Sequence, residues 1–199
     1  PLGSGLDNPV YALIVYDGKL IAGGGFGQGE VKSIASWDGL SWSSLGSGLD
    51  GQVLALTLYD GKLIAGGFLT LAGSVEVNGM TVWDGSSWSS IGSGVDSAVK
   101  ALTVYNGKLF AGGWFTNVGS VEAKNIAAWD GALWSSLGSG IGGVDWPNIS
   151  SITVYDGKLI VGGYFTTVGG VEAKNIAAWD GSSWSFLGSG TNKVVNVLM

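Results

Sequence analysis

The sequence predicts an all-β fold in which one unit of about 46 residues recurs four times. Three observations carry this prediction. The triplet WDG begins at Trp37, Trp83, Trp129 and Trp179. The motif Y(D/N)GKL begins at Tyr16, Tyr59, Tyr105 and Tyr155. The stretch VEAKNIAAWDG occurs unchanged at 121–131 and 171–181, so one slot of the unit is copied letter for letter. No segment spaces its apolar residues as a helix of three turns would.

Each unit reads as four short strands, and the third unit shows them most clearly. VKALTVY at 99–105 alternates apolar and polar residues, and the N-G pair after it favours a tight hairpin turn. GKLFAGG at 107–113 gives the second strand, and a loop through VGSVEAK leads to NIAAW at 125–129. A D-G turn then precedes the fourth strand, LWSSL at 133–137, which ends in GSG. Four strands in a period of about 40–50 residues are typical of a β-propeller blade.

The motifs divide the chain into four blades and two flanking pieces. Residues 1–8 are the lead-in, where PLGS looks like the remnant of a cleaved tag and LGSG also falls in register with the later copies. The predicted blades follow at 9–48, 49–94, 95–140 and 141–190. Residues 191–199 align with the start of a blade, so we expect them to form the first strand of a fifth, truncated one.

The two ends of the chain therefore offer the same strand. VYALIVY at 10–16 opens the first blade, and VVNVLM at 194–199 repeats that slot. Such a mismatch favours a fragment of a longer array or an engineered repeat protein. Open blade edges seek partners. We therefore expect self-association, with a homodimer completing one eight-bladed ring, which lies within the usual range of about 4–8 blades.

The composition excludes several classes of function. The chain has no His and no Cys, so the usual zinc sites, Ser-His-Asp triads and thiolate nucleophiles are excluded. Its nine cations are all Lys and its net charge is −6, which argues against nucleic-acid binding. No apolar run approaches the roughly 20 residues that span a bilayer, so no membrane insertion is expected. We expect no cofactor and no enzymatic activity.

The repeated polar and aromatic residues have mainly structural explanations. The Asp residues of WDG and of Y(D/N)G stand at turns, and Asn106 replaces one of them, which favours a turn role over acid–base catalysis. Lys19, Lys62, Lys108 and Lys158 recur after the first turn, and Glu76, Glu122 and Glu172 recur in a loop. They predict a solvated rim, with a ring that binds an ion or polar ligand as the alternative. The paired Trp residues of each unit predict packing between blades, with ligand stacking as the alternative.

One position varies while its neighbours stay nearly constant. After each glycine pair stand Gly25, Phe68, Trp114 and Tyr164, so three of the four are aromatic. A partly buried wall would explain them. A binding face would too, since aromatic rings stack on the apolar faces of sugars and peptides. Trp146, in the insertion of the fourth unit, is a further exposed candidate. The ligand-binding candidates are thus Phe68, Trp114, Tyr164 and Trp146.

The motifs GGYFTTVGG, NIAAWDGSSWSFLGSG and ITVYDGKLIVGG together resemble kelch-type propeller repeats. They are still more similar to the repeats of the fungal cortical-marker family and its bacterial relatives. The resemblance covers nearly the whole chain. It implies a non-catalytic scaffold for binding or assembly, with a lectin-like propeller as the alternative, and favours an extracellular or cell-surface place. The histidines of kelch-type metal sites are missing.

Overall fold

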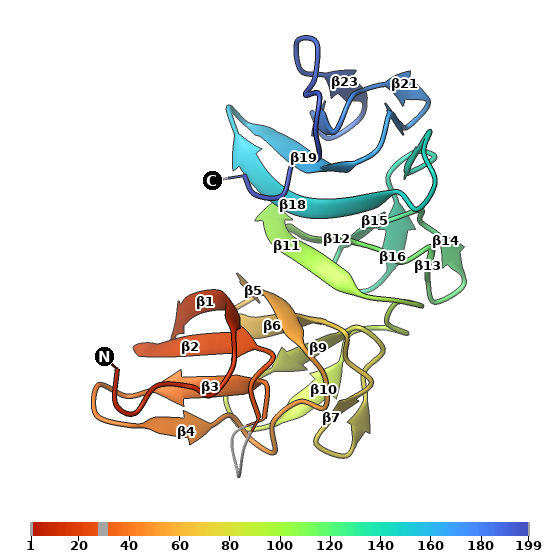
Figure 1. Ribbon diagram of the computed structural model, residues 1–199. Coiled ribbons are helices and arrows are strands. Elements are labelled where there is room, and N and C mark those ends of the chain that lie inside the picture. The colour runs from red at the N-terminus through yellow and green to blue at the C-terminus, as the bar shows by residue number, and fades with distance from the viewer. Residues whose placement is uncertain (1, 28–31, 199) are drawn as a thin grey trace. The chain divides into compact units, whose positions relative to one another are not determined.

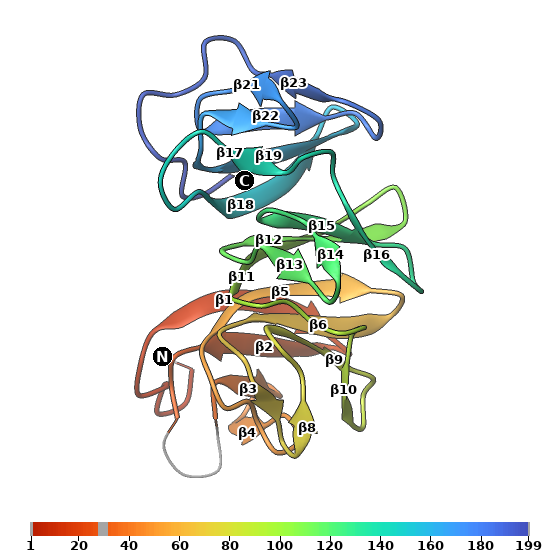
Figure 2. The ribbon, with the colours of Figure 1, turned by 90° about the vertical axis from the view of Figure 1, so that its right-hand side faces the viewer.

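The computed structural model describes residues 2–27 and 32–198, and every regular element in these ranges is a β-strand. The prediction of an all-β fold is confirmed (Figures 1 and 2). The chain divides into two compact units, Pro1–Gly94 and Val95–Met199. Each unit contains two of the sequence repeats.

Unit 1 contains two four-stranded antiparallel sheets, one from each repeat. The first sheet consists of β1 (Val10–Tyr16), β2 (Lys19–Gly24), β3 (Ile34–Trp37) and β4 (Trp42–Ser44). The second consists of β5 (Val53–Tyr59), β6 (Lys62–Gly67), β9 (Met80–Trp83) and β10 (Trp88–Ser90). A small hairpin of β7 (Leu71–Ala72) and β8 (Val75–Glu76) lies between β6 and β9 in sequence.

Unit 2 repeats this plan. Its first sheet consists of β11 (Val99–Tyr105), β12 (Lys108–Gly113), β15 (Ile126–Trp129) and β16 (Trp134–Ser136), with the hairpin β13 (Asn117–Val118) and β14 (Val121–Glu122). Its second sheet consists of β18 (Asn148–Tyr155), β19 (Lys158–Tyr164), β22 (Ile176–Trp179) and β23 (Trp184–Phe186). There β17 (Ile141–Gly142), β20 (Thr167–Val168) and β21 (Val171–Glu172) form a three-stranded sheet. Each repeat thus has the four strands that the sequence predicts for a blade.

The small hairpins correct one detail of the sequence prediction. The segment through VGSVEAK was expected to be a loop, but its ends pair, for example Asn117 with Glu122 and Val118 with Val121. Strands of two residues are too short to show an alternating pattern. In the last repeat β17, at the start of the insertion that precedes β18, pairs with β20 and so joins the small hairpin.

The first hairpin of every repeat has the predicted turn. Its Asp or Asn has a φ of 49–50° at Asp17, Asp60, Asn106 and Asp156. The glycine after it has a φ of 67–72° at Gly18, Gly61, Gly107 and Gly157. Two consecutive positive φ angles define the type I′ turn, whose twist matches that of the flanking strands.

The glycine pair that ends each second strand allows the next repeat to approach. A Cβ atom on Gly23 would lie against the side chain of Val53, and one on Gly112 would lie 2.6 Å from Cγ2 of Ile149. Real Cβ atoms essentially never come this close. Val53 and Ile149 belong to the first strand of the following repeat and are completely buried. Because these glycines have no side chain, Val53 and Ile149 can pack against the backbone of the preceding repeat.

The tryptophan pairs form a second contact between repeats. The rings of Trp83 and Trp88 lie 4.9 Å apart between centroids, and both are buried. The Nε1 group of Trp88 donates to the carbonyl of Leu45 in the preceding repeat at 3.1 Å, and Trp184 donates likewise to Leu137 at 3.2 Å. Within each unit the structure thus supports the packing explanation of these residues.

The lead-in takes part in the same contact. The Nε1 group of Trp42 donates to the carbonyl of Leu2 at 3.2 Å. Gly3 and Gly5 have φ angles of 57° and 81°, close to those of Gly46 and Gly48 in the next copy of the motif. LGSG at 2–5 thus acts as the closing segment of a repeat.

The C-terminal segment differs from the predicted strand, since residues 191–198 form no strand. Every other first strand pairs with the second strand of its own repeat, and no described residue pairs with 191–198 in that way. The side chains of Val195 and Leu198 nevertheless lie beside Gly162, where a first strand would place them.

We expect Gly107→Val to lower the free energy of unfolding by about 1–3 kcal/mol, because a β-branched residue is strained at positive φ. Gly107 has a φ of 72° and open space around its Cα, so the loss measures backbone strain alone. The matched control is Gly25→Val, at a position without positive φ where a Cβ meets only contacts of 3.5 Å or more. Urea unfolding of both variants tests this, and equal midpoints would contradict the assigned turn.

Candidate functional site

The candidate site begins with a β-bulge in the first strand of every repeat. Val99 pairs with Gly113 and Ala101 pairs with Gly112, so Lys100 between them has no ladder partner. The corresponding residues of the other repeats are Tyr11, Leu54 and Ser150. A bulge redirects the side chain of its extra residue. These four residues differ in every repeat, although their neighbours are similar.

The bulge residue lies beside the variable position that follows the glycine pair. In the third repeat, Nζ of Lys100 lies 4.8 Å from the ring centroid of Trp114. In the first repeat the variable position is Gly25, and a Cβ on it would lie 3.5 Å from Cε2 of Tyr11. The bulge residue Tyr11 therefore supplies the aromatic ring in this repeat. Each repeat therefore presents one aromatic ring near this end of its first strand. The exposed fractions are similar: 49% for Tyr11, 45% for Phe68, 44% for Trp114 and 40% for Tyr164.

In unit 2 polar groups connect the variable positions of the two repeats. Nζ of Lys100 lies 3.2 Å from Oγ of Ser150, which donates to Oδ1 of Asn148 at 2.9 Å. Asn148 pairs across the ladder with Tyr164. Partial burial lowers the pKa of Lys100 below its ordinary value. An amine, a hydroxyl and an amide thus lead from Trp114 to the ladder partner of Tyr164. Such groups hydrogen-bond to a polar ligand, while aromatic rings supply apolar faces.

The other predicted residues lie apart from this network. Trp146 is 89% exposed and has a φ of 59°, in the loop before β18. The adjoining carbonyl of Pro147 accepts a hydrogen bond from Nδ2 of Asn125 at 3.0 Å, which holds the loop to the third repeat. Phe68 belongs to unit 1 and follows β6. Of the four predicted residues, Trp114 contacts this network through Lys100, and Tyr164 is the ladder partner of its last member, Asn148.

The sequence analysis missed a set of aspartates that hold the small hairpins. Asp96 accepts hydrogen bonds from the backbone N and the hydroxyl of Thr116 and from the backbone N and the side-chain amide of Asn117. Asp50 accepts the corresponding bonds from Thr70. Partial burial raises the pKa of both carboxyl groups, but the hydrogen bonds from threonine and its neighbours outweigh this and lower it. Their signal was an Asp four residues after the first glycine of the LGSG motif.

The WDG aspartates are turn residues, as the sequence predicts. Oδ1 of Asp84 accepts hydrogen bonds from the backbone N of Ser86 and Ser87, each at 2.8 Å. Asp180 accepts the same pair from Ser182 and Ser183. The backbone bonds, first that from Ser87 and then that from Ser86, hold the pKa of Asp84 well below its ordinary value. A carboxylate stabilised in this way is a poor general base.

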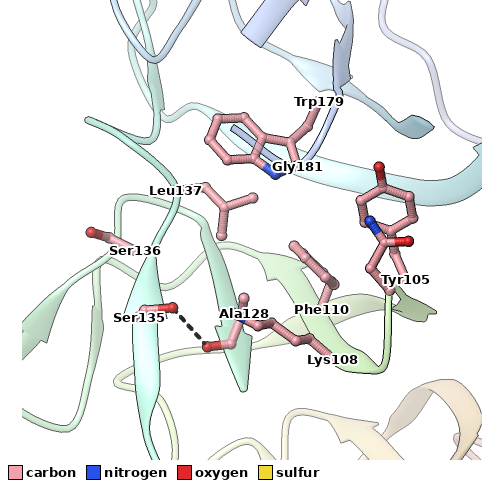
Figure 3. Close-up of a pocket in the computed structure, with 10 residues that line it drawn as sticks. Tyr105, Lys108, Phe110, Ala128, Ser135, Ser136, Leu137, Trp179 and Gly181 are labelled. Carbon is pink, nitrogen blue, oxygen red and sulfur yellow. Dashed lines mark hydrogen bonds between the residues drawn. The ribbon is translucent and has the colours of Figure 1, made fainter. Parts of the chain in front are cut away.

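A cavity of about 140 Å³ lies between the two repeats of unit 2, near the C-terminal end of β11 (Figure 3). The rings of Tyr105, Phe110 and Trp179 and the side chain of Lys108 line it. The Tyr105 hydroxyl donates to the carbonyl of Gly157 at 2.9 Å, and Oγ of Ser135 donates to the carbonyl of Ala128 at 3.3 Å. The lining contains no carboxylate. The Tyr105 bond thus links the two repeats, and the Ser135 bond lies within the sheet of the third repeat.

In the described part of the chain, the remaining charged residues form no cluster typical of a metal site. The described residues contain no group of three or more Asp and Glu side chains that suits a metal ion. The recurring Lys and Glu residues of the predicted rim are exposed. Oε1 of Glu122 forms a salt bridge with Nζ of Lys124 at 3.4 Å. Among the described residues, no helix is long and apolar enough to cross a bilayer.

Comparison with known proteins supports the fold. Residues 106–127 and 156–177 match the model of DUF5122, a domain of unknown function described as a β-propeller. They are the same part of the third and fourth repeats, from the first turn into the third strand. The chain is built of β-propeller repeats. No curated protein matches its sequence.

Solved structures with similar folds are distant in sequence. Two crystal structures of the extracellular domain of BT4673 from B. thetaiotaomicron, described as a one-component and as a hybrid two-component system, match with TM-scores of 0.61 and 0.58 at 13% identity. They cover 98% and 92% of this chain but 24% and 22% of their own. The structure of U3-55K matches with a TM-score of 0.53 at 13% identity, covering 91% of this chain and 52% of its own. The chain thus spans about half of the length of U3-55K and less than a quarter of each BT4673 domain, and the similarity to these three structures establishes the fold alone.

The turn aspartates predict how stability depends on pH. Their folded pKa values lie below the ordinary value of 3.8, so their contribution is fully present above that pH and is lost as the pH falls through the folded values. We expect the urea midpoint to stay level between about pH 7 and 5 and to fall below about pH 4.

The double variant Asp84→Asn/Asp180→Asn isolates this effect. Asn keeps an oxygen that accepts the backbone bonds but does not titrate near pH 4, so this variant should lose less stability than the parent on acidification. An equal or larger loss would show that these carboxylates are not the groups responsible.

Proposed function

We propose that the chain is a non-catalytic binding module whose repeats share one scaffold and differ at the paired bulge and aromatic positions. The observation that carries this is the network in unit 2, where Lys100, Ser150 and Asn148 lead from the half-exposed ring of Trp114 to the ladder partner of Tyr164. The structural residues around these positions are similar from repeat to repeat, and the glycine pair is present in all four. Variation at partly or fully exposed side chains on a constant backbone suits ligand recognition.

The second candidate is a lectin-like propeller that uses the aromatic residues after the glycine pairs. Trp114 and Tyr164 supply ring faces for the apolar side of a sugar, and the amine, hydroxyl and amide between them suit its hydroxyl groups. The similarity of the repeats to kelch-type and cortical-marker propellers agrees with a binding platform at an extracellular or cell surface. A peptide with exposed aromatic or aliphatic side chains would use the same rings.

A glycan array and a peptide array probed with the parent protein would identify the class of ligand. For the best ligand, Trp114→Ala should weaken binding about tenfold or more, as expected for a central aromatic anchor. Tyr164→Ala should weaken it as well, because the ring lies at the other end of the same network. Ligand affinity is measured by isothermal titration calorimetry.

Two further variants serve as comparisons. Leu133→Ala changes an exposed apolar residue in a turn of the third repeat, 72% exposed, and should bind as the parent does. Trp146→Ala tests whether the insertion loop reaches the ligand. If both Trp114→Ala and Tyr164→Ala retain parental affinity, the site assigned to unit 2 is wrong.

A further inference from the structure

The first strand of the first repeat exposes apolar side chains that other repeats bury. Val10 and Leu13 on β1 are 40% and 60% exposed. Val53 and Ile149 occupy the place of Val10 in the second and fourth repeats, and both are completely buried. The sequence VYALIVY of β1 contains no charged residue that would protect this edge.

The structure shows what such residues contact when they are covered. Val53 and Leu56 of the second repeat lie against Gly23. A Cβ atom on Gly23 would lie 3.4 Å from Cδ1 of Leu56. Ile149 and Ile152 of the fourth repeat lie against Gly112 in the same way. Gly23 and Gly112, each the first glycine of its pair, are therefore sockets for two apolar side chains of the next first strand in the same unit. In the first repeat, Val10 and Leu13 are those two side chains.

The equivalent socket of the fourth repeat is filled by the C-terminal segment. Cγ1 of Val195 would lie 2.5 Å, and Cδ1 of Leu198 3.3 Å, from a Cβ atom on Gly162. Two hydrogen bonds hold the segment there. The backbone N–H of Val195 donates to the carbonyl of Gly163 at 3.3 Å, and the backbone N–H of Leu198 donates to Oγ of Ser151 at 3.0 Å. It forms no strand, and Val197 is 68% exposed. Its hold is thus weaker than that of a complete first strand.

Residues 187–198 and 2–13 are copies of one piece of the repeat. Each begins with LGSG, and Val195 follows Leu187 by the same number of residues as Val10 follows Leu2. Either copy therefore carries the side chains that fit the socket at Gly162. Only β1 is already extended and paired with a second strand.

A second contact of the fourth repeat is also open. The Tyr105 hydroxyl donates to the carbonyl of Gly157, in the first turn of the following repeat. Tyr105 is 5% exposed, whereas Tyr155, at the same place in the fourth repeat, is 73% exposed. The C-terminal segment contains no such turn. The first repeat does, and Gly18 stands in it where Gly157 stands in the fourth.

We propose that the first repeat of one copy of this chain docks on the fourth repeat of a second copy. Val10 and Leu13 then take the socket at Gly162 in place of the second copy's own Val195 and Leu198. The second copy's Tyr155 donates its hydroxyl to the carbonyl of Gly18. Residues 191–198 act as a displaceable cover that competes with this docking. Two chains joined at both such contacts carry eight repeats, within the usual propeller range of about 4–8 blades.

Light scattering of the 199-residue chain over a range of concentrations tests the proposal. We expect the mass to approach twice the chain mass of 20.3 kDa as concentration rises. Val10→Ser/Leu13→Ser should keep the mass of one chain. The matched control Leu40→Ser/Leu133→Ser changes two residues that are 87% and 72% exposed, outside β1, and should associate like the parent.

Two further variants decide the outcome even if the β1 variant fails to fold. Deletion of 191–199 should lower the apparent dissociation constant about tenfold if the segment fills the socket nine-tenths of the time. Tyr155→Phe should raise it about two- to tenfold, as expected for one hydrogen bond. A single-chain mass for both the parent and the truncated protein at all concentrations would overturn the proposal. So would unchanged association of a folded β1 variant, or of the truncated and Tyr155→Phe proteins together.

Discussion

The architecture within each unit depends on a side chain that is absent. At Gly23 and Gly112, the first glycines of their pairs, the backbone of a second strand comes so close to the next repeat that no Cβ atom fits. Val53 and Leu56 in unit 1, and Ile149 and Ile152 in unit 2, occupy the space at Gly23 and Gly112. The second glycine of the pair faces a carbonyl of its own repeat instead, as Gly113 faces Ala98. One dipeptide thus serves both the closure of a repeat and its packing on the next.

The tryptophan pairs and the LGSG motif add direction to this packing. An indole N–H of one repeat is satisfied by a leucine carbonyl of the preceding repeat, which suits a large ring whose single polar group must find a partner when buried. Positive φ angles at the first and last glycine of LGSG bend the chain so that the carbonyl points at the ring. Because the motif is a turn rather than a strand, a repeat can be joined to the next without extending the sheet.

The sequence allowed the strands, the hairpin turns and the tryptophan pairs to be predicted because each depends on local chemistry that recurs four times. The β-bulge could not be predicted, because Val99 and Ala101 fit a regular alternating strand as well as a bulged one. The hairpins of two residues are below the length at which a period is visible. The role of Asp50 and Asp96 lay in the repeat but depended on contacts 20 residues away, to Thr70 and Thr116. The C-terminal segment shows the limit of alignment: it has the side chains of a first strand without the ladder that would make it one.

The bulge at Tyr11, Leu54, Lys100 and Ser150 has a consequence for how such a protein can change. In a regular strand, every residue is tied to a ladder partner and to one face of the sheet, so a new side chain alters pairing or packing. The extra residue of the bulge is exempt from both requirements, and an aromatic, an aliphatic, a cationic and a small polar residue occupy it in the four repeats without changing the register on either side. Each repeat therefore contains one position where chemical diversity is nearly free of folding constraints. A library randomised at these four positions and at the residues after the glycine pairs would sample recognition while leaving the scaffold intact.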